Sequence, residues 1–165
     1  MSIYMDKAVE ILFYEPEDPN GYLSNFAICP IMVDGQVWAT SEHYYQAMKF
    51  TSQKLRLNIF EASTPNEAFI LSRKYKDQVR GDWHDIRLKV MRFIVTEKFR
   101  QNPYLLLFLQ STGKSIIKEH TPKDHFWGDG GDGTGENHLG KILMAVRQQL
   151  TAGSVFPLQV PVYCC

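Results

Sequence analysis

The chain has 165 residues, 44% of them hydrophobic and 22% charged, which is the composition of a single globular domain and not of a disordered chain. Its 18 basic and 18 acidic residues cancel, which argues against a broad basic surface for duplex DNA, although a small phosphate ligand needs only a local cluster of donors. The sequence has no apolar run long enough to span a membrane, no signal-peptide pattern and only three cysteines, so we expect a cytoplasmic or nuclear protein without a disulfide scaffold.

Local signals define the predicted elements in chain order. The pair Asp34-Gly35 between two apolar runs indicates a β-hairpin, because both turn residues must adopt a positive φ. Thr40 offers an N-cap for the next helix, and residues 64–67 combine a cap, a proline at the first helical position and a glutamate three residues after the cap. Asp82 is placed to cap a long helix.

These signals predict a helix-rich α+β domain with a small antiparallel sheet. The expected strands cover residues 8–14, 28–33, 36–39 and 115–120, and the expected helices cover residues 41–50, 53–62, 65–74, 83–101, 104–110 and 139–150. The core stripe of the long helix would include Ile86, Val90, Phe93, Ile94 and Phe99. We assign residues 1–150 to the domain and residues 151–165 to a C-terminal tail.

The segment around the first helix is one place where chemistry could occur. Glu42, Gln46 and Lys49 stand at i, i+4 and i+7, so they share one helix face. Such a face can bind a sugar hydroxyl, a base edge and a phosphate, but spacing alone fits a solvated face with mild ion pairing better. Glu42 lies in the first turn, where the helix dipole favours its ionised form. His43 is most simply a packed or surface histidine.

A second candidate is the loop and helix start at residues 121–141, which hold six of the 11 glycines. Glycine lets the backbone approach a ligand closely, and the helix N-terminus can hold an anion. Trp127 offers a flat face for a base, with the carboxylate of Asp129 beside it. The loop also contains GxGxxG, but no βαβ unit surrounds it, and Ile142 replaces the Ser or Thr of a P-loop. A surface loop that needs glycine for its turns is the alternative.

A third candidate pairs Trp83 with Arg87 one helical turn later. Together they could stack a base and hold a phosphate, although Trp83 alone is more simply an anchor of the helix to the core. Arg73 and Lys74 end the third helix, where they could bind phosphate or only complement the helix dipole.

In this order, the stretches FYEPEDPNGYLSNFA, IMVDGQVWATSEHYYQAMKF, TPNEA, RGDWHDIRLKVM and TPKDHFWGDGGDGTGENHLGKILMAVRQQL resemble the NADAR family. The resemblance covers about residues 11–150. It implies an N-glycosidase without metal or cofactor, acting on a nucleotide-like small molecule such as a ribosylamino-pyrimidine phosphate of riboflavin biosynthesis. In some members of the family the substrate is ADP-ribose attached to guanine in nucleic acid.

The resemblance, together with the chemistry of ribosyl C–N cleavage, suggests roles for individual residues. The reaction builds positive charge on the ribose, so a carboxylate should face that charge and a second group should activate water. We assign Glu42 to the cation, Asp129 to the water and Trp127 to the base, and the two carboxylate roles could be exchanged. The expected substrate-binding residues are Asn25, Gln46, Lys49, Arg73, Trp83, Arg87, Gly128, Gly130 and Asn137.

Two other functions fit the same sequence. A non-catalytic ADP-ribose or NAD-binding module would use the glycine loop and Trp127 without turnover. An interaction protein could instead dock residues 154–162 of its tail on a partner. The presence of both Glu42 and Asp129 favours the enzyme, because a simple binder needs neither carboxylate. The sequence predicts no oligomeric state.

Overall fold

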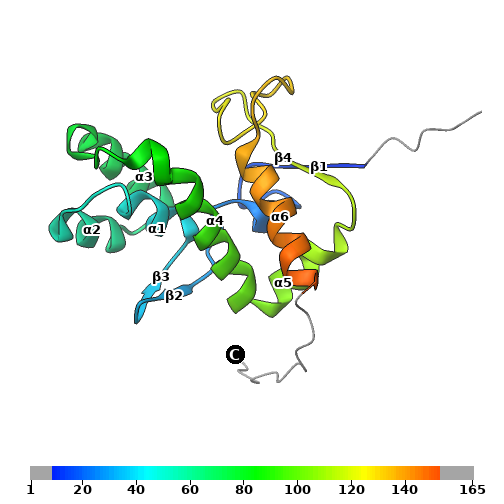
Figure 1. The fold of residues 1–165 in the computed structure, drawn as a ribbon, viewed down its shortest axis with the longest axis horizontal. Helices are drawn as coiled ribbons and strands as arrows, with labels where there is room; N and C mark the ends of the chain where they lie inside the picture. Colours follow the sequence, from blue (N-terminus) through cyan, green and yellow to red (C-terminus); the bar gives the residue numbers. More distant parts are fainter. Residues whose placement is uncertain (1–8, 153–165) are drawn as a thin grey trace, which may run out of the picture.

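The computed structural model describes residues 9–152 and forms a helix-rich α+β domain (Figure 1). Helices α1–α3 gather on one side, α5 and α6 lie on the other, and the long helix α4 runs between them (Figure 1). The strands are β1 (Glu10–Phe13), β2 (Ile31–Val33), β3 (Gln36–Trp38) and β4 (Ile116–Glu119). The helices are α1 (Ser41–Ala47), α2 (Gln53–Phe60), α3 (Pro65–Lys74), α4 (Trp83–Gln101), α5 (Pro103–Ser111) and α6 (His138–Ala152).

Two small sheets are present in this part of the chain. The predicted antiparallel hairpin is β2–β3, and its turn has positive φ at Asp34 and Gly35, as the sequence indicated. The second pair, β1–β4, is parallel, with Phe13 opposite Glu119. The sequence predicts both strands but not their pairing, because most of the chain separates them.

The caps of the helices explain where two of them begin. Thr40 accepts a hydrogen bond from the His43 amide at the start of α1. Thr64 accepts from the Glu67 amide at the start of α3, so these two predicted caps are present. Asp82 differs from the expectation, because its carboxylate makes an ion pair with Arg80 and makes no side-chain cap bond to α4.

The buried face of α4 differs from the predicted stripe. Ile94 and Phe99 are fully buried and Ile86 and Val90 are partly buried, but Phe93 is 44% exposed. Met91 and Val95 are buried in its place. The helix contacts α1, α5, α6 and β2, so the core surrounds more of its circumference than one stripe covers.

Helix α6 packs closely on β4. An added Cβ at Gly140 would lie 2.1 Å from the Ile117 carbonyl oxygen, so only glycine allows this approach. Asn137, with φ of 50°, joins the two elements: its Oδ1 accepts from the Glu119 amide and its Nδ2 donates to the Ile117 carbonyl. These contacts fix the end of β4.

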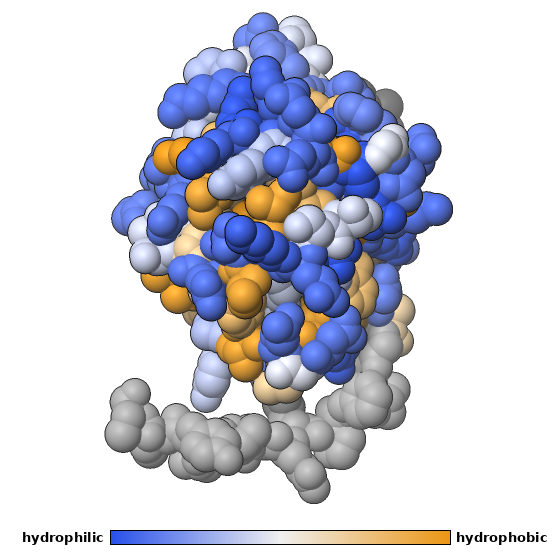
Figure 2. Space-filling view, turned by 90° about the vertical axis from the view of Figure 1, so that its left-hand side faces the viewer, coloured by the Kyte–Doolittle hydropathy of each residue, from blue (hydrophilic) through white to orange (hydrophobic). Residues whose placement is uncertain are grey.

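The surface over α2 and α3 is mostly hydrophilic, with hydrophobic residues showing between the polar side chains (Figure 2). Within residues 9–152, no helix is long and apolar enough to cross a membrane. The tail beyond residue 152, including Cys164 and Cys165, lies outside the described residues.

Candidate active site

The largest cavity described has a volume of about 660 Å³ and lies among α1, α3, β4 and the loop after β4. Segments far apart in the sequence supply its walls. Its aromatic lining residues are Tyr14, Phe26, Tyr45, Phe69 and Trp127. Its charged lining residues are Glu15, Glu42, Lys49, Arg73, Glu119, Lys123 and Asp124.

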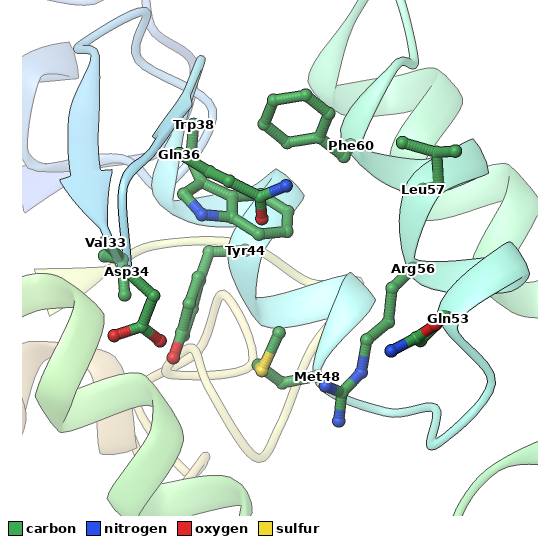
Figure 3. Close-up of a pocket in the computed structure, with 10 residues that line it drawn as sticks. All are labelled: Val33, Asp34, Gln36, Trp38, Tyr44, Met48, Gln53, Arg56, Leu57 and Phe60. Atoms are coloured by element: carbon green, nitrogen blue, oxygen red, sulfur yellow. The ribbon is translucent and has the colours of Figure 1, made fainter.

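A second cavity of about 400 Å³ lies between the β2–β3 hairpin, α1 and α2 (Figure 3). The rings of Trp38, Tyr44 and Phe60 form one of its walls through edge-to-face contacts at 5.2 and 4.9 Å. Arg56 and Asp34 are its charged residues, and Arg56 Nε donates to the Phe50 carbonyl oxygen. This cavity lacks a cluster of carboxylates and cations, so the larger cavity is the better candidate for catalysis.

Glu42 is held inside the larger cavity by a chain of side-chain hydrogen bonds. It is 6% exposed, and its Oε1 accepts from Gln46 Nε2 at 2.6 Å. Gln46 Oε1 accepts in turn from the hydroxyl of Ser72 on α3. The amide of Gln46 therefore orients Glu42 instead of being free on the helix surface.

Burial decides the protonation of Glu42. It raises the pKa of the carboxyl to about 7, with Asp124 adding to the rise, whereas Gln46 and Lys49 act to lower it. The helix dipole was expected to favour the ionised form, but in this cavity desolvation outweighs it. A carboxyl with a pKa near 7 changes its charge in the physiological range.

Two cations line the cavity together with Glu42. Lys49 Nζ is 5.5 Å from the centre of the Tyr45 ring, and burial lowers the pKa of its ammonium while Glu42 raises it. Arg73 lies on α3 and lines the cavity from the adjacent side. Positive charge at this end of the cavity suits a phosphate group.

Trp127 lines the cavity, and its ring meets Tyr45 edge to face at 5.5 Å. Its backbone is fixed by Asp124, whose Oδ1 accepts from the amides of Phe126 and Trp127. Asn25, after the short 3-10 helix Gly21–Leu23, also lines the cavity. Its Nδ2 lies 3.1 Å from Met91 Sδ, whereas its buried Oδ1 has no partner among the described residues.

Two carboxylates of the cavity, Glu119 and Asp124, were not predicted from the sequence. Glu119 is in the predicted strand at 115–120, where it shares a face with the fully buried Ile117. That alternation was the signal that could have found it. Asp124 carried no such signal, because it lies in a loop whose path the sequence does not give.

The other residues named from the sequence surround the cavity without lining it. Asp129 is 3% exposed, with Oδ2 2.9 Å from His120 Nδ1 and Oδ1 accepting from the Gly131 amide. Although burial acts to raise the pKa of Asp129, these hydrogen bonds hold it below its usual value. Asn137 is occupied by β4 through the two hydrogen bonds given above.

Trp83 and Arg87 do not line the cavity but pack against aromatic residues next to it. Trp83 is buried, with its ring 5.0 Å from that of Tyr45. Arg87 stacks on Phe126 at 3.6 Å, and Phe126 in turn meets Trp127 at 4.9 Å. Gly128 and Gly130 are close-packed and do not line the cavity: added Cβ atoms would meet backbone oxygens at Gly128 and the His125 ring at Gly130.

The chemistry of the cavity is that of acids, bases and phosphate-binding cations. Among residues 9–152, no three histidine, cysteine, aspartate or glutamate side chains are grouped as metal ligands would be. Carboxylates, an aromatic wall and cations together can bind a phosphorylated sugar joined to a flat base.

Comparison with known proteins agrees with this chemistry. The family model described as the NADAR domain matches residues 12–151. The chain belongs to the NADAR family. Over 140 residues it is 44% identical to N-glycosidase YbiA of Escherichia coli, covering 85% of this chain and 88% of that protein.

Two further relatives and one solved structure are similar. The chain is 54% identical to riboflavin biosynthesis protein VVA0006 of Vibrio vulnificus over 85% of its own length but only 38% of that protein. It is 41% identical to N-glycosidase Npun_R5314 of Nostoc punctiforme, covering 85% and 92%. The NMR structure of E. coli YbiA has a TM-score of 0.84 and 39% identity, covering 93% of each chain, which confirms the predicted fold class.

Proposed function

We propose that this NADAR-family chain hydrolyses the bond between a ribose phosphate and the nitrogen of a base, with a ribosylamino-pyrimidine phosphate as the substrate class. It is an N-glycosidase of the YbiA type, at 41–44% identity to relatives of that name. The observation that carries the proposal is a buried carboxylate, Glu42, in a cavity that also holds phosphate-binding cations and a tryptophan. A relative named for riboflavin biosynthesis supports the choice of substrate.

Glu42 would stabilise the positive charge that develops on the ribose and receive a proton from the attacking water. Its hydrogen bond from Gln46 fixes the carboxylate before substrate arrives, so little reorganisation is needed during the reaction. Lys49 keeps part of the Glu42 population ionised at neutral pH by lowering its pKa against the effect of burial.

Arg73 and Lys49 would bind the phosphate, and Trp127 would hold the base against the aromatic wall. Binding energy at the phosphate, away from the reacting bond, then orients the ribose beside Glu42. The free Oδ1 of Asn25 is placed to accept a hydrogen bond from the substrate.

Asp129 would act through its neighbours and not on water directly. Its main-chain N–H donates to the Glu119 carbonyl oxygen and its carboxylate holds His120 and Gly131, so it positions the end of β4 and the start of the loop. Loss of the Asp129 carboxylate should therefore reduce activity and thermal stability together, whereas Glu42→Gln should reduce activity without lowering thermal stability.

The test follows base release by chromatography from a ribosylamino-pyrimidine 5′-phosphate, from DNA carrying ADP-ribosylated guanine, and from NAD. We expect release from the first, and a loss of about 100-fold or more in kcat for Glu42→Gln, which is ordinary for a positioned carboxylate. Glu61→Gln removes an exposed carboxylate at the end of α2 and is the matched control.

A folded Glu42→Gln protein that turns over at the wild-type rate would refute the assigned mechanism. Release only from the modified DNA would move the substrate class to ADP-ribosylated guanine. No release from any of the three, with ADP-ribose bound and recovered unchanged, would favour the non-catalytic binding module.

A further inference from the structure

Glu119 is a second acid in the proposed active site, partly buried, and the mechanism above does not use it. It is the last residue of β4 and lines the cavity. Its carboxyl oxygen Oε2 is inaccessible to solvent and has no hydrogen-bond partner among residues 9–152. A buried, unpaired carboxyl oxygen on a cavity wall is costly for the folded protein unless a ligand pairs with it.

The main chain holds Glu119 rigidly in this position. Its amide donates to Asn137 Oδ1 at 3.1 Å, and its carbonyl oxygen accepts from the Asp129 amide at 2.8 Å. Glu119 is also paired with Phe13 in the parallel β1–β4 sheet, which restrains its backbone further. The backbone of Glu119 is thereby fixed at the cavity, which keeps the carboxyl group within reach of a bound substrate, as a proton donor requires.

The charges around Glu119 favour the protonated form of its carboxyl group. Burial, together with the negative charges of Asp124, Glu42 and Asp129, raises the pKa of Glu119 to about 8. These three carboxylates come from α1 and the loop after β4, and the cations on the same cavity are Lys49, Arg73 and Lys123. The pKa values of the two acids differ, at about 7 for Glu42 and about 8 for Glu119. The acid with the lower pKa, Glu42, suits the role of base, and Glu119 suits the role of acid.

We propose that Glu119 is a catalytic residue, the general acid that protonates the departing base. As the C1′–N bond breaks, its electron pair goes to the nitrogen, which takes the proton of Glu119. Water forms the new bond to C1′ and its proton passes to Glu42. The products are the free base and the ribose phosphate, with Glu119 ionised and Glu42 protonated, and solvent exchange restores the starting protonation. This role rests on the proposed N-glycosidase function.

The first experiment needs only the wild-type protein and two substrates. One is the ribosylamino-pyrimidine 5′-phosphate, whose leaving nitrogen needs a proton. The other is 4-nitrophenyl riboside 5-phosphate, whose leaving group departs as a stable anion. We expect kcat for the first to fall as pH rises through about 8, whereas kcat for the second stays level. The same alkaline fall with both substrates would overturn the role of Glu119 as proton donor.

The second experiment uses Glu119→Gln, which keeps the shape but cannot give up a proton. We expect kcat on the pyrimidine substrate to fall about 100-fold or more and to lose its alkaline limb, with less than about tenfold loss on the nitrophenyl substrate. Glu61→Gln, which removes an exposed carboxylate outside the cavity, should keep the alkaline limb.

The outcomes separate the two proposals. If wild type is active and Glu42→Gln is inactive, but Glu119→Gln keeps both the rate and the alkaline limb, only the role of Glu119 is wrong. If wild type releases no base from any substrate, the proposed function itself is wrong. Should Glu119→Gln fail to fold, the two-substrate comparison with wild type still decides the question.

Discussion

At the scale of single residues, the buried carboxyl groups should make the stability of the protein depend on pH. The pKa values of Glu42 and Glu119 are about 7 and about 8 in the folded state, above the 4.5 of an unperturbed glutamate. Between these values the folded state binds more protons than the unfolded state, so these groups reduce stability as pH rises from about 4.5 to about 8. Lys98 has the opposite effect above about pH 8. Burial lowers the pKa of its ammonium to about 8, so its contribution to stability increases as pH rises from there.

A comparison of wild type with Glu119→Gln at each pH isolates one group. We expect the variant to gain melting temperature relative to wild type as pH rises from 5 to 9. The gain should reach at least a few degrees, since about 1 kcal/mol corresponds to roughly 2–4 °C for a domain of this size. Thermal melts followed by circular dichroism give the difference, and a constant difference across this pH range would contradict a raised pKa for Glu119.

Arg73 should matter for binding more than for chemistry. It lies on α3 and lines the cavity, whereas Glu119 lies at the end of β4. Arg73→Met removes a phosphate partner, so we expect KM to rise about tenfold or more with kcat reduced less than about threefold. Arg73→Lys keeps the positive charge but not the paired N–H donors, so its KM should lie between those of wild type and Arg73→Met. Initial-rate kinetics check this, and an unchanged KM would exclude Arg73 from phosphate binding.

The sequence could place residues of one element on one side of the cavity, but not residues from several elements. Glu42, Gln46 and Lys49 were expected on one face of α1 because helical spacing determines it, and all three line the cavity. Whether that face was solvated or enclosed depends on α3, β4 and the loop. The isolated sequence therefore could not predict that Gln46 is tied to both Glu42 and Ser72.

At the scale of elements, the contact between α6 and β4 should be sensitive to one methyl group. Gly140→Ala would place a Cβ 2.1 Å from a backbone oxygen, and the main chain has to move to relieve it. We expect the free energy of unfolding to fall by about 1–3 kcal/mol, as in other overpacked cores. Gly81→Ala is the matched control, because an added Cβ there meets no atom within 4 Å. Urea unfolding of both variants measures the effect, and equal stability would contradict it.

Helix starts were predicted well where the signal is local, as at Thr64, whose hydroxyl accepts from the Glu67 amide while the Glu67 carboxylate accepts from the Ser63 amide. Asp82 failed as a cap because Arg80, two residues away, competes for the same carboxylate. The exposed Phe93 shows the other limit. A periodic stripe cannot anticipate a helix that is surrounded by four elements.

At the scale of the whole molecule, the family and the fold class were within reach of the sequence, and both are confirmed. The parallel pairing of β1 with β4 was not, since it joins segments that are far apart in the sequence. Glu119, at the end of β4, lines the same cavity as Glu42 of α1. The active site thus depends on long-range contacts that no local pattern encodes.

The way the loop after β4 folds back on itself has a consequence for a cut chain. Its outermost residues, 132–134, are exposed, while the two sides of the loop are joined beneath them by main-chain hydrogen bonds from Gly135 to Asp129, Asn137 to Gly128 and Leu139 to Trp127. A protease that cleaves within 132–134 would break none of these bonds. We expect the nicked protein to stay in one piece under native conditions and to keep most of its activity, while denaturing gels show two fragments. Trp127 and Glu119 would then be held by a chain that is no longer continuous. Loss of activity in step with cleavage would show that residues 132–134 themselves contribute to activity.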